Sequence, residues 1–251
     1  DVCSSDLYMD LTPRQKDLLK AIIELHARTG EPVGSEHVDK EYSLGVSPAT
    51  IRNEMVRLTE LGYLKQPHTS AGRTPTSQGF RIYINELMKE KQVPVSAEVS
   101  IREALWQQRY KEERLLREGV RALAARCGML GMAVDKDGSL YYAGAANVLD
   151  WPEFADIDVT RFVFSLFDEY PMLQQILGRA VGTQPMHVLF GEELEFDNLE
   201  PIGFVFSRYI GKDENSGGMI GVVGPARMNF PVIMPYVRYT SDLISQALNS
   251  Y

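Results

Sequence analysis

The sequence predicts an α+β protein in two parts, on three observations. Residues 12–62 contain three segments in which apolar residues recur at helical spacing, each preceded by a residue that can cap a helix. A short strand, a polar loop and a return strand follow these segments. Beyond residue 128 the apolar pattern becomes strand-like with helices between the strands, which is typical of an antiparallel sheet flanked by helices.

The first three helices follow from their caps and spacing. We expect the first from Thr12 to about Thr29 and the second from Ser35 to about Tyr42, joined by a turn at 30–34. Ser47 caps the third helix, because its hydroxyl can accept a hydrogen bond from an amide of the first turn, and Pro48 suits the first helical position. Gly62 ends this helix. Its predicted buried face consists of Ile51, Met55, Leu58 and Leu61.

The polar residues of the third helix lie off the apolar face. Arginine can pair with guanine through two hydrogen bonds, and asparagine can do the same with adenine. A helix with Thr50, Arg52, Asn53 and Arg57 on its outer side therefore suits insertion into a DNA major groove. An ordinary amphipathic helix with a solvated polar face explains the same pattern, and the helix alone does not decide between the two.

A small hairpin follows the third helix. Residues 63–65 and 74–76 are expected strands, and the loop 66–73 between them is suited to contact with phosphate or a minor groove. Three helices followed by such a hairpin form the plan of a winged helix-turn-helix, whose third helix reads DNA. The predicted DNA-binding residues are Ser47, Pro48, Ala49, Thr50, Arg52, Asn53, Arg57, His68, Thr69, Ser70 and Arg73.

From Leu11 to Met88 the sequence resembles the N-terminal domain of the HrcA heat-inducible transcription repressors. The most specific pieces are GEPVGS, VSPATIRNEM and QPHTSAGR. YYAGAANVLDWPEF and GMIGVVGPARMNFPVIMPYVRYTSDLISQAL resemble later family segments in the same order. The resemblance implies a GAF-like C-terminal domain and a homodimer that binds double-stranded DNA at an inverted-repeat operator called CIRCE. It also implies repression of chaperone genes in the stress response and restoration of activity by the chaperonin GroEL.

The chain departs from the family in one respect. Only about a dozen residues separate Arg126 from Leu140. Typical members carry a further GAF-like portion and an inserted dimerisation segment before the YYAGAANVLDWPEF segment. We therefore interpret the chain as a shortened member, whose dimerisation cannot be carried over from the family.

The rest of the chain predicts the domain organisation. After a fourth helix at 77–91, Pro94 marks a boundary, and a long helix runs from about Ala97 to Arg126. This helix either covers its own domain or forms a dimer interface, and we favour the interface. Its apolar stripe consists of Ile101, Leu105, Leu115, Leu116, Val120 and Leu123. We expect further helices at 158–177 and 241–249. The predicted domains are a tail (1–10), a winged-helix domain (11–93), a linker or dimerisation helix (94–127) and a GAF-like domain (128–251).

Composition limits the class of protein. The net charge is −8 and the pI about 5.1, so DNA affinity has to come from a local surface. The segment from Arg52 to Lys89 can supply such a surface, because it contains six cationic residues and only three carboxylates. No apolar run approaches the ~20 residues that span a membrane, and two cysteines make no disulfide framework, so we expect a cytoplasmic protein.

Patterns of enzymes and metal sites are missing from the sequence. It contains no HExxH, CxxC, Walker A or GxSxG motif, and its four histidines have no evident catalytic partners. Residues 192–195 read as a solvated acidic loop. We expect no enzymatic activity, no cofactor and no metal. The alternative function is a winged-helix regulator that senses a small molecule, and a weaker one is an enzyme built on the C-terminal domain.

Overall fold

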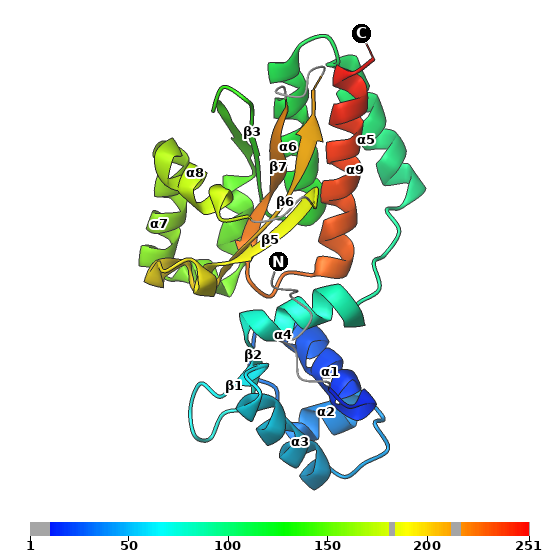
Figure 1. The fold of residues 1–251 in the computed structure, drawn as a ribbon, viewed down its shortest axis with the longest axis vertical. Helices are drawn as coiled ribbons and strands as arrows, with labels where there is room; N and C mark the ends of the chain where they lie inside the picture. The colour runs from blue at the N-terminus through cyan, green and yellow to red at the C-terminus, as the bar shows by residue number, and fades with distance from the viewer. Residues whose placement is uncertain (1–10, 181–183, 212–216, 251) are drawn as a thin grey trace, which may run out of the picture. The chain divides into compact units, whose positions relative to one another are not determined.

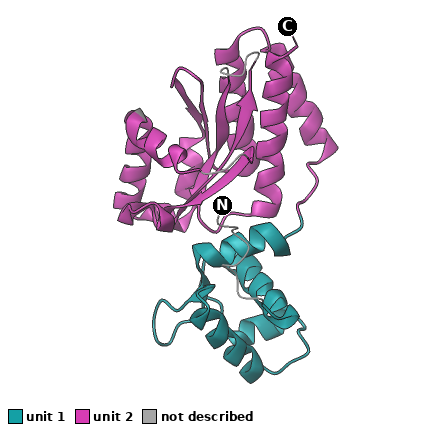
Figure 2. Ribbon diagram, in the orientation of Figure 1, with its two compact units in different colours: residues 1–89 teal, residues 90–251 magenta. Residues whose placement is uncertain are grey.

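The computed structural model describes residues 11–180, 184–211 and 217–250. The chain divides into two compact units, residues 1–89 and 90–251 (Figure 2). The predicted N-terminal tail, with Cys3, lies outside the described residues. Within the ranges that the structure describes, every helix is too short or too polar to span a membrane.

The first unit is a winged helix-turn-helix, as the sequence predicts (Figure 1). Two of the three predicted N-caps form: Thr12 and Ser47 each accept a backbone amide on their side-chain oxygen. Ser35 does not cap the second helix, because it is the first helical residue and Gly34, which has no side chain to accept a hydrogen bond, precedes it. Thr76 caps the fourth helix. Ile51, Met55 and Leu58 are buried as predicted, whereas Leu61, which follows the last helical residue, is only partly buried. The elements are α1 (Pro13–Thr29), α2 (Ser35–Glu41), α3 (Pro48–Glu60), β1 (Leu64–Lys65), β2 (Thr74–Pro75), α4 (Ser77–Ile82) and a π-helical turn (Tyr83–Leu87).

The fourth helix is shorter than predicted. It widens into the π-helical turn and ends at Leu87, because the Met88 amide donates to the Tyr83 carbonyl and the backbone of Met88 is extended. The next residues bond elsewhere: the Lys91 amide donates to the Pro231 carbonyl at 2.8 Å. A hydrogen bond to a distant part of the chain thus replaces the helical bond that local spacing favours.

The second unit is built on a five-stranded antiparallel sheet in the order β4-β3-β7-β6-β5. Side chains alternate across it: Ile202, Phe204 and Phe206 belong to the core on one face. This confirms the predicted α+β fold. The strands are β3 (Leu130–Val134), β4 (Leu140–Ala143), β5 (Met186–Phe190), β6 (Ile202–Ile210) and β7 (Gly217–Pro225).

Helices cover both faces of this sheet (Figure 1). On one face lie α6 (Glu112–Cys127) and α9 (Phe230–Leu248), with α5 (Val95–Gln107) packed against both. A Cβ on Gly131 would stand 2.4 Å from the Val120 carbonyl oxygen, so glycine lets α6 approach β3 closely. The other face carries α7 (Ile157–Asp168), α8 (Tyr170–Gly178) and short 3-10 segments at Ala145–Asp150, Pro152–Ala155, Gly191–Glu193 and Asp197–Leu199.

The prediction of one long helix from Ala97 to Arg126 is wrong. The chain turns at residues 108–111, and α5 and α6 pack against each other. The predicted stripe is buried within the unit, at 0–2% exposure for all six residues. A straight helix of 30 residues would extend about 45 Å, longer than any strand beneath it. The stripe therefore covers its own unit and is not a dimer interface.

Two other helices differ from their predicted bounds, and each contains a proline. The expected helix 158–177 breaks at Glu169, and Pro171 lies in the first turn of α8. Conversely, α9 begins at Phe230, not at Ser241, with Pro235 inside it. Pro235 has no amide for the Pro231 carbonyl, and that carbonyl instead accepts the Lys91 amide.

His187 makes the stability of the second unit dependent on pH. The residue is 7% exposed, and its ring stacks on Phe206 with 5.5 Å between centroids. Burial, followed by the charge of Arg208, lowers the pKa of the imidazole. The unfolded chain therefore takes up a proton at higher pH than the folded chain, and stability falls as the pH drops below about 6.5 towards the lowered pKa.

We expect His187→Phe to lose less stability on acidification than the parent protein. The measurement is urea unfolding at pH 7.5 and 5.5, with the exposed His37→Gln as control. Equal losses for all three proteins would mean that His187 titrates alike in the folded and unfolded states.

Candidate nucleic-acid interface

Ser47 and Thr50 shape the start of α3. The Thr50 amide donates to Ser47 Oγ at 3.3 Å, and the two hydroxyl oxygens are 3.0 Å apart. Pro48 occupies the first turn and Ala49 is exposed. This helix N-terminus has the partial positive charge that suits a phosphate, and its short side chains leave the backbone accessible.

The outward face of α3 carries Arg52, Asn53 and Arg57, all exposed. Arg57 lies 3.6 Å from Glu54, whose carboxylate also accepts from Gln15 Nε2 at 3.0 Å. Of this pair only Arg57 is well exposed, at 65% against 13% for Glu54, so the Arg57 guanidinium is open to a phosphate. Within the described part of the chain, Arg52 forms no ion pair.

Arg73 lies against α3 and not at the tip of the wing. Its Nε donates to Thr59 Oγ1 at 3.0 Å, and its backbone pairs with Val33 in both directions. A Cβ on Gly72 would stand 2.4 Å from the Val33 carbonyl, so this approach requires glycine. Burial lowers the pKa of Arg73, and the nearby charge of Arg52 lowers it further. The charge of Arg52 therefore acts on Arg73, and a bound anion would offset the repulsion between them.

The tip of the wing presents His68, Thr69 and Ser70, which are exposed. Gln66 organises this loop, because its Nε2 donates to the carbonyls of Thr69 (2.9 Å) and Ala71 (3.0 Å). The loop is therefore closed by its own hydrogen bonds before any partner binds.

Sequence reasoning missed two residues that position this surface, Thr59 and Gln66. Thr59 lies seven residues after Arg52 and therefore on the same face of α3, a spacing that could have revealed it. Gln66 has no such signal, because a loop glutamine can bond in many ways. The structure holds Arg73 against Thr59 of α3, the helix whose outer face carries Arg52, and both guanidinium groups attract phosphate. The fold and this surface define a winged helix-turn-helix DNA-binding protein.

Comparisons with known proteins give the family. Residues 10–89 match the family description "Winged helix-turn-helix transcription repressor, HrcA DNA-binding", and residues 53–234 match "HrcA protein C terminal domain". The chain belongs to the HrcA family of heat-inducible transcription repressors.

Similar curated proteins carry the same description. A heat-inducible transcription repressor HrcA from Syntrophobacter fumaroxidans is 27% identical over 341 aligned positions, covering 95% of this chain and 98% of that protein. At least 90 of those positions face gaps here, because the chain has 251 residues, in agreement with a shortened member. One from Desulforamulus reducens is 51% identical over 94 residues, covering 38% of this chain and 27% of that protein.

A solved structure shares the fold. The crystal structure of a hypothetical protein at 2.2 Å resolution aligns with a TM-score of 0.79 and 19% identity, covering 96% of this chain and 99% of that one. At this identity the likeness concerns the fold alone.

Proposed function

We propose that this protein represses chaperone genes by binding, as a homodimer, an inverted-repeat operator of the CIRCE type. The observation that carries the proposal is the exposed pair Arg52 and Asn53 on α3, beside Arg73. Arginine and asparagine can read guanine and adenine in the major groove, and a backbone phosphate bound nearby would offset the repulsion between Arg52 and Arg73.

An inverted repeat requires two reading helices related by a two-fold axis. Because the stripe of α5 and α6 is buried in its own unit, the dimer uses another surface. A dimer bound across a promoter represses by excluding RNA polymerase. The protein then acts where the DNA is, in the cytoplasm of a bacterial cell.

Heat acts on this repressor through its folded fraction. Operator occupancy depends on the concentration of folded dimer, so a repressor of marginal stability loses occupancy as temperature rises. GroEL would restore occupancy by returning unfolded chains to the folded state. Because chaperonin engaged with other unfolded proteins is unavailable, repression would weaken when those proteins accumulate.

Footprinting on the chaperonin promoter of the source organism tests the operator. We expect protection of both halves of an inverted repeat. In a second arm the repressor is warmed until binding is lost, and GroEL with ATP is added. Recovery of the footprint supports the chaperonin step, and protection of a single half-site would contradict a dimer.

Arg73 provides a prediction about salt dependence. We expect Arg73→Ala to weaken binding to cognate and scrambled duplexes alike, and to reduce the slope of log affinity against log salt by about one unit. Fluorescence anisotropy at several salt concentrations measures both. Thr59→Val distinguishes the charge of Arg73 from its position, because it removes the hydrogen bond that Arg73 donates to Thr59 and keeps the guanidinium charge. An unchanged slope for Arg73→Ala would exclude a phosphate contact.

A further inference from the structure

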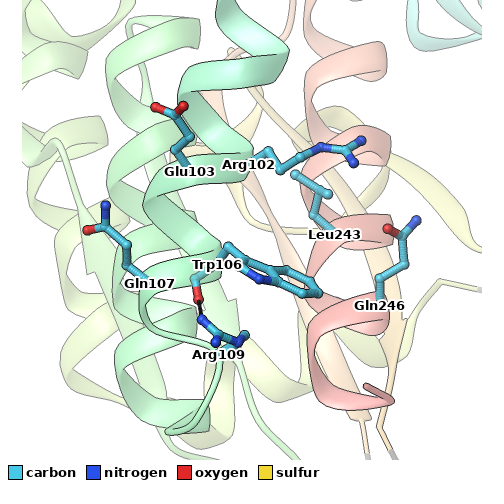
Figure 3. Close-up of a pocket in the computed structure, with 7 residues that line it drawn as sticks. All are labelled: Arg102, Glu103, Trp106, Gln107, Arg109, Leu243 and Gln246. Atoms are coloured by element: carbon cyan, nitrogen blue, oxygen red, sulfur yellow. Dashed lines mark hydrogen bonds between the residues drawn. The ribbon is translucent and has the colours of Figure 1, made fainter. Parts of the chain in front are cut away.

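A cavity of about 530 Å³ opens between α5 and α9 (Figure 3). This volume lies in the range of about 300–1,000 Å³ that small-molecule sites occupy. The proposed repressor function uses none of its residues. The lining side chains are Arg102, Glu103, Trp106, Gln107 and Arg109 from α5 and the turn after it, and Leu243 and Gln246 from α9.

One wall of the cavity is aromatic. The indole of Trp106 extends towards α9, where Leu243 and Gln246 lie (Figure 3). Trp106 is 42% exposed, although tryptophan is usually well covered, whereas Leu243 is buried at 3%. A flat ring stacked on the indole would cover apolar surface that water now contacts.

Cations flank this aromatic wall. Arg102 and Arg109 stand four residues before and three after Trp106, so both border the indole. The Arg109 guanidinium lies 5.3 Å from the Trp106 ring centre and donates to the Trp106 carbonyl at 2.6 Å. It is therefore held in place before a ligand arrives.

Arg102 supplies the charge that can bind a ligand. Its side chain extends towards α9, whereas the carboxylate of Glu103 points away from α9 (Figure 3). Among the residues that the structure describes, Arg102 has neither a hydrogen bond nor an ion pair from its side chain. Gln246, exposed on α9, offers both a donor and an acceptor on the opposite wall.

We propose that this cavity binds a small planar aromatic anion, such as an aromatic carboxylate. The ring stacks on Trp106 beside Leu243, the carboxylate pairs with Arg102, and Gln246 bonds a polar substituent. Such a ligand bridges α5 and α9 and stabilises the second unit by mass action. A neutral ring leaves the guanidinium of Arg102 without a new partner, and an aliphatic acid leaves the indole uncovered.

The test uses 2-naphthoate as probe and its neutral isostere 2-naphthamide as control, with the full chain and no DNA. Calorimetric titration should give saturable one-to-one binding of 2-naphthoate. We expect Arg102→Gln to weaken it about 10-fold, since one charge-assisted hydrogen bond is lost, and Trp106→Ala to abolish it. The exposed Arg114→Gln on α6, which removes the same charge elsewhere, should bind 2-naphthoate like the parent.

Thermal melts complete the design. Arg102 and Trp106 lie on the surface, so both variants should melt like the parent protein when no probe is present. Lack of saturable binding by the parent, or equal affinity for 2-naphthoate and 2-naphthamide that Arg102→Gln leaves unchanged, would overturn the proposal. Neither result affects the proposed repressor function, because operator binding is measured separately.

Discussion

We expect Leu116→Glu to unfold the second unit and not to release a folded monomer. Leu116 is completely buried on α6. Truncating a buried leucine costs about 2–5 kcal/mol, and an unpaired buried carboxylate costs more. Because domains are stable by only about 5–15 kcal/mol, the substitution removes most or all of that margin. Circular dichroism melts and sedimentation velocity measure the two outcomes.

Leu149→Glu is the matched control, because Leu149 is 58% exposed and receives the same substitution. It should melt like the parent protein. A folded, monomeric Leu116→Glu protein would restore the dimer role that the sequence suggested for this stripe. Loss of the fold leaves the dimer interface to be sought on another surface.

We expect Arg52→Ala to lose roughly 1–3 kcal/mol of binding to the cognate operator, about 5- to 150-fold in affinity, and much less on a scrambled duplex. The reason is that a bidentate base contact contributes only where the base is correct. Competition binding on both duplexes measures the difference.

Arg28→Ala serves as control for a lost positive charge in the same unit. Arg28 lies in the last turn of α1, where it pairs with Glu41 and not with the α3 surface. It should bind both duplexes like the parent. If Arg52→Ala weakens both duplexes equally, Arg52 binds phosphate and reads no base.

The N-terminal unit could be predicted from sequence because local signals agree with its tertiary structure. Thr12 and Ser47 cap the N-termini of α1 and α3. Gly30 and Gly62 follow the C-terminal ends of these helices, where the backbone adopts a positive φ. Each of these signals acts within a few residues, where spacing alone predicts geometry. The strand-like pattern beyond residue 128 was also readable, since the spacing of apolar residues is a local feature.

The candidate site was predicted as a set of residues but not as an arrangement. The exposed face of α3 follows from helical spacing, so Arg52 and Asn53 are where the sequence puts them. Arg73 is different: its contact with Thr59 and its closeness to Arg52 depend on how the wing returns past Val33. The assignment of these residues to DNA contacts stays a prediction.

The sequence by itself determined the winged helix, the α+β class and the HrcA family, because these depend on caps, periodicity and motifs that are local along the chain. Only the tertiary structure decided where α5 ends and α6 begins, that α9 starts at Phe230, and which surface the apolar stripe covers. Those outcomes depend on partners far away in sequence, such as the Lys91 amide that bonds the Pro231 carbonyl. Periodicity shows that a face is apolar, and only packing shows what covers it.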